Sequence, residues 1–104
     1  MNAPLPRSRV SYEWRVEEVD LESDDINDGY SFDTAADAVA RFREQPPEGC
    51  RHDLVLVRDY GNWAEGVIDR QWAYVGEDGQ LPETFDSGAK VTEAHRRSLA
   101  KAWG

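Results

Sequence analysis

Cysteine is nearly absent from the chain: Cys50 is the only one, so no internal disulfide can form. A chain without disulfides is typical of a reducing compartment, and we expect a cytoplasmic location in a bacterial host. Long apolar runs are also missing. The opening MNAPLPRSRV lacks the apolar centre of a signal peptide, and no stretch approaches the length of a membrane span. These absences exclude a disulfide scaffold and predict no membrane partner.

Positive charge is scarce. Twelve basic residues stand against 21 acidic ones, giving a formal net charge of −9. Phosphate groups are repelled by such a field, which argues against direct binding of nucleic acid or of an anionic membrane surface. The balance instead favours a basic partner or a surface that keeps the protein in solution.

The length and composition fit one folded domain. The chain has 104 residues, 39% of them hydrophobic, with four Trp, four Tyr and three Phe. That aromatic content excludes a disordered chain. Residues 1–9 include two prolines and are predicted to be a flexible N-terminal tail, so the expected domain comprises residues 10–104.

The first half of this domain predicts a strand followed by a helix. Residues 10–21 alternate, and the early apolar positions share one face: Val10, Tyr12, Trp14 and Val16. Val19 and Leu21 have the opposite parity, which a bulge near residues 17–18 would correct. NDG at 27–29 predicts a turn. Asp33 or Thr34 then caps a helix that Pro46–Pro47 ends.

The second half predicts three strands in a meander and a final helix. DLVLVRDY at 53–60 suits a central strand, and GN at 61–62 predicts a tight hairpin into a strand over 63–75. QLPETF at 80–85 follows as an edge strand or loop because it contains Pro82. Thr92 caps the last helix. We therefore predict an α+β, two-layer fold: an antiparallel sheet of about four strands with one or two helices packed on one face.

The negative charge is concentrated in one segment. Between Glu13 and Asp37 there are ten acidic residues and one basic residue, Arg15, whereas the rest of the chain is balanced. One interpretation is a solvated loop that keeps the protein soluble. The other is a partner-binding face that occupies a basic groove with carboxylates in place of phosphates. The candidate residues for this face are Glu17, Glu18, Asp20, Glu22, Asp24, Asp25 and Asp28.

Part of this segment, DDINDG, has the composition of a calcium loop but not its spacing. With Gly29 at the sixth position of an EF-hand loop, the third position is Ile26 and the twelfth is Ala35. A ligand and the bidentate anchor are both missing. We predict no metal and no cofactor.

Catalytic patterns are weak. CRHD at 50–53 gathers Cys50, His52 and Asp53, but working triads are assembled from separated segments. His52 and His95 are far apart in the sequence, and with one cysteine they would make an incomplete zinc site. We predict that the protein is not an enzyme.

The aromatic residues allow two interpretations. Trp63, Trp72, Tyr74 and Trp103 can form the core of so small a domain or a binding platform. Arg70 shares a face with Trp72 and can stack on it. We take Trp63, Arg70 and Trp72 as a secondary candidate partner-binding site. The basic last helix could pair with the acidic segment of another copy, giving a homodimer.

EGVIDRQWAYVGEDGQLPETFDSGAKV at 65–91, together with WRVEEVD and FDTAADAVARF upstream, resembles a group of small acidic, uncharacterised proteins from phages and prophages of proteobacteria. The likeness extends from Trp14 onward and is most specific in the run DRQWAYV…DG.LP..F. It implies a mobile-element origin and supplies no catalytic residues. By analogy of class, small acidic phage proteins include anti-CRISPR and anti-restriction inhibitors that mimic nucleic acid.

The sequence thus supports three hypotheses. The first is a phage-derived acidic protein that inhibits a host nucleic-acid-binding defence complex through a DNA-mimicking carboxylate face. The second is a phage accessory or structural protein that binds a protein partner, or itself, through its aromatic surface. The third and weakest is a small hydrolase or nuclease that uses His52.

Overall fold

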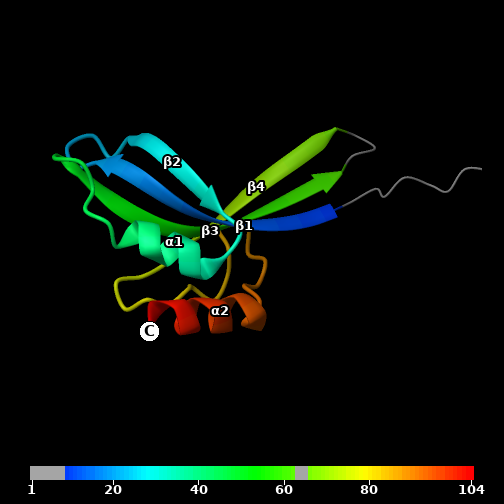
Figure 1. Ribbon diagram of the computed structural model, residues 1–104. Helices are drawn as coiled ribbons and strands as arrows, with labels where there is room; N and C mark the ends of the chain where they lie inside the picture. Colours follow the sequence, from blue (N-terminus) through cyan, green and yellow to red (C-terminus); the bar gives the residue numbers. More distant parts are fainter. Residues whose placement is uncertain (1–8, 63–65) are drawn as a thin grey trace, which may run out of the picture.

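The computed structural model describes residues 9–62 and 66–104 and shows an antiparallel sheet with two helices on one face (Figure 1). Its elements are β1 (Arg9–Asp20), β2 (Ile26–Phe32), α1 (Ala35–Phe42), β3 (Cys50–Asn62), β4 (Val67–Tyr74) and α2 (Glu93–Trp103). The four strands lie in the order β2-β1-β3-β4. The predicted two-layer α+β fold is confirmed.

Strand β1 is central, because it pairs with β2 on one side and with β3 on the other. The chain makes the β1–β2 hairpin, passes through α1 to the far side of β1, and returns as the β3–β4 hairpin. Both helices and the segment between β4 and α2 lie beneath the sheet in Figure 1. The opposite face carries no helix.

The core lies between the sheet and the helices. Strand β1 contributes Trp14 and Val16, and the segment between β4 and α2 contributes Leu81, Phe85 and Val91. The remaining members of this cluster are Ala35, Ala38, Val39, Leu54, Leu56, Ala73 and Leu99. An irregular segment therefore completes the core, which explains its apolar side chains at irregular spacing.

Both helices begin as predicted. The Thr34 hydroxyl accepts a hydrogen bond from the Asp37 backbone N–H, and the Thr92 hydroxyl accepts one from His95 in the same way. The end of α1 differs from the prediction. It stops at Phe42, before Pro46–Pro47, and the Phe42 ring there packs against Trp103 of α2, with centroids 5.7 Å apart.

The prediction missed β2 altogether. Asn27, Asp28 and Gly29, expected in a turn, lie in this strand, whose Tyr30 pairs with Val16. The predicted bulge exists in the β1–β2 pairing, but the extra residue is Asn27 on β2, while β1 and β3 stay in continuous register. Val19 thus keeps the parity opposite to Val16 and is buried on the face without helices.

Two predictions for the second half were also wrong. Gly61 and Asn62 are not a hairpin turn: they belong to β3 and pair with Ile68 and Val67. The connection therefore falls later, and its residues 63–65 lie outside the described residues. Residues 80–85 form no third strand of a meander, since their only ladder contact is the single bridge from Thr84 to Lys90.

Carboxylates close the outward edges of the sheet at one point each. On β4, the Trp72 N–H donates to the Asp86 carboxylate at 3.0 Å, and the Asp86 N–H donates to the Trp72 carbonyl at 3.0 Å. On β2, the Gly29 N–H donates to the Asp28 carboxylate at 2.8 Å. Backbone groups satisfied in this way are unavailable to a strand from another molecule.

We expect the stability of the protein to fall as the pH decreases below about 6.5, with His95 as a contributor. Burial against Tyr12 and Trp14, whose ring centroids lie 4.4 and 6.0 Å away, lowers the pKa of His95 below its ordinary value of 6.5. The unfolded chain then binds a proton more readily than the folded one, so acid favours unfolding. Urea unfolding at pH 7.5 and pH 5.5 should show a smaller decrease for His95→Gln than for wild type. An identical decrease in both would contradict this assignment, since His52 is common to them.

Candidate functional site

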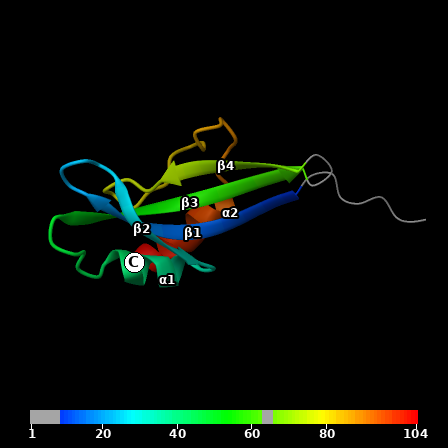
Figure 2. The same cartoon turned by 90° about the horizontal axis from the view of Figure 1, so that it is seen from above.

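The face of the sheet that carries no helix is called here the open face, and it is turned toward the reader in Figure 2. Strand alternation places on it every second residue of the three neighbouring strands. These residues are Glu13, Arg15 and Glu17 of β1, Asp53, Val55, Val57 and Asp59 of β3, and Arg70, Trp72 and Tyr74 of β4.

Apolar surface at the centre of the open face is covered by large side chains. Val55 and Val57 are fully buried although no helix covers them. The cross-strand neighbours of Val55 are Arg15 and Tyr74, and Trp72 is a neighbour of Val57. The open face is therefore a thin second layer of arginine and aromatic side chains.

A buried carboxylate lies under this layer. Glu17 is 1% exposed, and its Oε1 accepts a hydrogen bond from the Tyr74 hydroxyl at 2.7 Å. Its Oε2 lies 3.5 Å from Arg15 Nε, and among the described residues neither atom makes a hydrogen bond. Burial, and then the bond to Glu17, raise the pKa of Tyr74. The phenol therefore stays protonated and keeps donating to the carboxylate.

Gly29 is the residue that lets Arg15 reach this position. A Cβ built on Gly29 would overlap the Arg15 guanidinium, which lies across β2 at this point. Any side chain here would push away the cation that balances Glu17. A buried carboxylate without its cation is strongly destabilising.

The other two arginines of the open face are held between carboxylates. Arg70 contacts Asp59 at 2.9 Å and Glu13 at 3.2 Å. Arg51, next along β3, joins Asp53 at 3.1 Å to Asp24 at 2.8 Å. Their positive charge is thus already matched within the chain.

Aromatic rings form a column along β4. The Arg70 guanidinium lies 5.7 Å from the centre of the Trp72 ring. The rings of Trp72 and Tyr74 follow, nearly parallel at 16°, with centroids 6.5 Å apart. Tyr74 is 46% exposed even though its hydroxyl is bound to Glu17. The column therefore presents ring faces to solvent, and of the secondary candidates it includes Arg70 and Trp72, while Trp63 lies outside the described residues.

One end of the open face meets the β1–β2 connection, residues 20–25, called here the acidic turn. The Asp20 carboxylate accepts hydrogen bonds from the backbone N–H groups of Ser23 and Glu22, which lower the pKa of Asp20. Asp24 adopts a left-handed conformation with φ of 60° and reaches Arg51. The turn is therefore held by its own side chains.

The seven predicted carboxylates do not form one continuous surface. Glu17 and Glu18 are buried and, as neighbours in a strand, point to opposite faces. On the helix face Glu18 lies 3.3 Å from Arg41 and 3.5 Å from His52 Nε2. Because β1 is central and covered on both sides, these two residues are corrected from surface to interior. Five remain at or near the surface: Asp20, Glu22, Asp24, Asp25 and Asp28.

Sequence reasoning missed one member of the acidic end. The Leu21 N–H donates to the Gly49 carbonyl at 2.9 Å, which brings the loop before β3 beside the acidic turn. Glu48 is exposed in that loop. The separation of this residue from Glu22 in the sequence left no local signal that the two lie near each other.

The structure does not assemble a catalytic centre from the candidates in the sequence. His52 Nδ1 faces the Phe42 carbonyl at 3.3 Å, and the other nitrogen faces Glu18. His95 instead packs beside Tyr12 and Trp14. Within residues 9–62 and 66–104, no three His, Cys, Asp or Glu side chains are grouped so that they could hold a metal ion.

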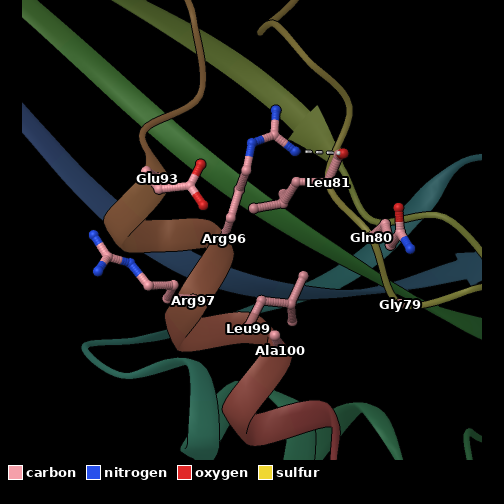
Figure 3. Close-up of a pocket in the computed structure, with 8 residues that line it drawn as sticks. All are labelled: Gly79, Gln80, Leu81, Glu93, Arg96, Arg97, Leu99 and Ala100. Carbon is pink, nitrogen blue, oxygen red and sulfur yellow. Dashed lines mark hydrogen bonds between the residues drawn. The ribbon is translucent and has the colours of Figure 1, made fainter.

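A hollow of about 280 Å³ beside α2 is explained by packing (Figure 3). Arg96 crosses it and donates to the carbonyls of Leu81 at 3.0 Å and Pro82 at 2.7 Å. This guanidinium is used to fix the segment that completes the core. The hollow therefore marks a structural contact.

Comparison with models of known protein families found no match, and neither did comparison with curated proteins or with solved structures. In the part of the chain that the structure describes, no helix has the length and apolar character needed to cross a membrane.

We expect Gly29→Ala to destabilise the protein by about 2–4 kcal/mol, because the new methyl group displaces Arg15 from the buried Glu17. Urea unfolding measures this free energy. Ser31→Ala, at an exposed position of the same strand, is the matched control and should cost under about 0.5 kcal/mol.

A double-mutant cycle with Arg15→Ala identifies the cause. If Gly29→Ala acts through the guanidinium, its cost falls strongly once Arg15 is gone. The same cost in both backgrounds would show that Arg15 is not involved.

Proposed function

We propose that the protein is a non-enzymatic binding protein whose acidic end docks on a basic surface of a protein partner. The observation that carries this proposal is a set of exposed carboxylates, Glu22, Asp25 and Glu48, which make no ion pair with any described residue. Arg51 and Arg70 nearby are already matched by carboxylates. The acidic end therefore offers unbalanced negative charge to a partner.

The fixed geometry of the acidic turn supports a binding role over simple solvation. Asp20 holds the backbone of the turn at 2.8 and 3.0 Å, and Arg51 fixes Asp24. Carboxylates on an ordered backbone lose little entropy when a partner binds. A segment that served only to keep the protein soluble would not need this order.

The partner that fits best is one that normally grips nucleic acid. A groove built for phosphates is lined by arginine and lysine, and charge-assisted bonds to carboxylates can replace those to phosphates. The resemblance of residues 65–91 to small acidic phage proteins points the same way. We propose an inhibitor of a host nucleic-acid-binding defence complex, of the anti-CRISPR or anti-restriction type, acting in the bacterial cytosol.

A second candidate rests on the exposed apolar residues of β4. Ile68 is 57% exposed and Tyr74 is 46% exposed on the open face. A phage accessory or structural protein could use them to bind another protein or a second copy of itself. Such binding would depend little on salt, which separates it from the first candidate.

The test compares wild type with the triple variant Glu22→Gln, Asp25→Asn and Glu48→Gln. Partners are captured from host lysate at low and at physiological salt, identified by mass spectrometry, and their affinities then measured directly. We expect the wild-type affinity to fall as salt rises and the variant to bind at least about ten-fold more weakly, since complementary charges are lost.

A second triple variant controls for net charge. Asp33→Asn, Glu77→Gln and Glu83→Gln remove the same charge from exposed positions away from the acidic turn. This control should bind nearly as wild type does. Equal binding by all three proteins, insensitive to salt, would disprove the acidic docking site.

A further inference from the structure

We propose that the open face continues the docking surface and receives arginine side chains of the partner, with Trp72 and Tyr74 as stacking platforms. This inference rests on the proposed function, because it specifies the chemistry of the same basic partner. It adds a second, chemically distinct contact to the charge of the acidic turn.

Arg51 makes the acidic end and the open face continuous. It links Asp24 in the acidic turn to Asp53 on β3. Asp53 lies opposite Glu17, which in turn is bonded to Tyr74. A partner seated on the acidic turn therefore meets the aromatic column next.

The charges of the open face favour a cation as occupant. Five carboxylates surround three guanidinium groups there, which leaves a surplus of two negative charges. The carboxylates are Glu13, Glu17, Asp24, Asp53 and Asp59, and the arginines are Arg15, Arg51 and Arg70. Nucleic acid and a second copy of this negative face are both repelled. A basic segment of a protein is attracted.

The exposed rings favour arginine over lysine. A planar guanidinium stacks on an aromatic ring, whereas an ammonium is a hydrated point charge. The chain itself uses this contact on other strands, with Arg41 lying 4.2 Å from the Tyr30 ring centre and Arg58 lying 5.8 Å from that of Tyr60. The nearly parallel rings of Trp72 and Tyr74 offer the same contact to an incoming side chain.

Extension of the sheet by another strand is a poorer explanation of this surface. Asp86 occupies the outward backbone groups of Trp72, and Asp28 occupies the N–H of Gly29. A partner is thus directed to the face of the sheet and away from these points on its edges.

The experiment titrates the full-length protein against two fluorescent peptides, octa-arginine and octa-lysine, by fluorescence anisotropy. The peptides have equal length and charge, so the acidic turn alone binds both equally. We expect wild type to prefer octa-arginine by about three-fold to five-fold, the range of an exposed cation–π contact. Trp72→Leu should abolish this preference.

Two further variants separate the contacts. Tyr74→Phe keeps the ring and should keep the preference for octa-arginine. The triple variant of the acidic turn should weaken both peptides equally and leave the preference unchanged.

Backbone amide shifts of the wild-type protein provide a measurement independent of any variant. Octa-arginine should shift the amides of Trp72 and Tyr74 and leave those of Ala38 and Leu99, in the core beneath the sheet, unchanged.

Equal affinity for the two peptides, or a preference that survives Trp72→Leu, would overturn the inference while salt-dependent binding left the proposed function standing. The absence of salt-dependent binding of either peptide to wild type would overturn both.

Discussion

The arrangement of the fold depends on two adjacent buried carboxylates in the central strand. Glu17 and Glu18 lie on opposite faces of β1, and each needs its own positive or donor group because a buried charge without partners is costly. Glu17 is matched by Arg15 and Tyr74, and Glu18 by Arg41 and His52. These contacts join β1 to β3, β4 and α1. The same pair of residues also requires glycine in β2, where Arg15 lies across the backbone.

Much of the fold was readable from local patterns. Alternation identified most of β1, β3 and β4, and hydroxyl caps identified the starts of both helices. Strand β2 was missed because Asn, Asp and Gly disfavour strands and favour turns. Its place in the sheet is set by tertiary contacts instead: Tyr30 pairs with Val16, and Gly29 gives room to Arg15.

The candidate site was less predictable than the fold. Charge concentration pointed to the correct end of the molecule, but it could not separate exposed from buried acids. Glu17 and Glu18 sit in a strand covered on both faces, where alternation no longer distinguishes inside from outside. The bond from Tyr74 to Glu17 and the position of Glu48 beside the acidic turn depend on contacts between distant segments. No local pattern encodes those contacts.

The order of residues around the buried pair also bears on how the chain avoids misfolding. Residues 16–19 read Val-Glu-Glu-Val, so a slip of β1 by one position would still present a glutamate on each face. The slip would, however, bring Arg15 into the place of Trp14 in the apolar core, and a strand displaced by one residue exchanges all its faces. The alternation of Trp14 and Arg15 thus selects between two registers that the carboxylates alone would leave close in energy. The strand carries its own check on pairing, next to the residues whose charge makes an error most expensive.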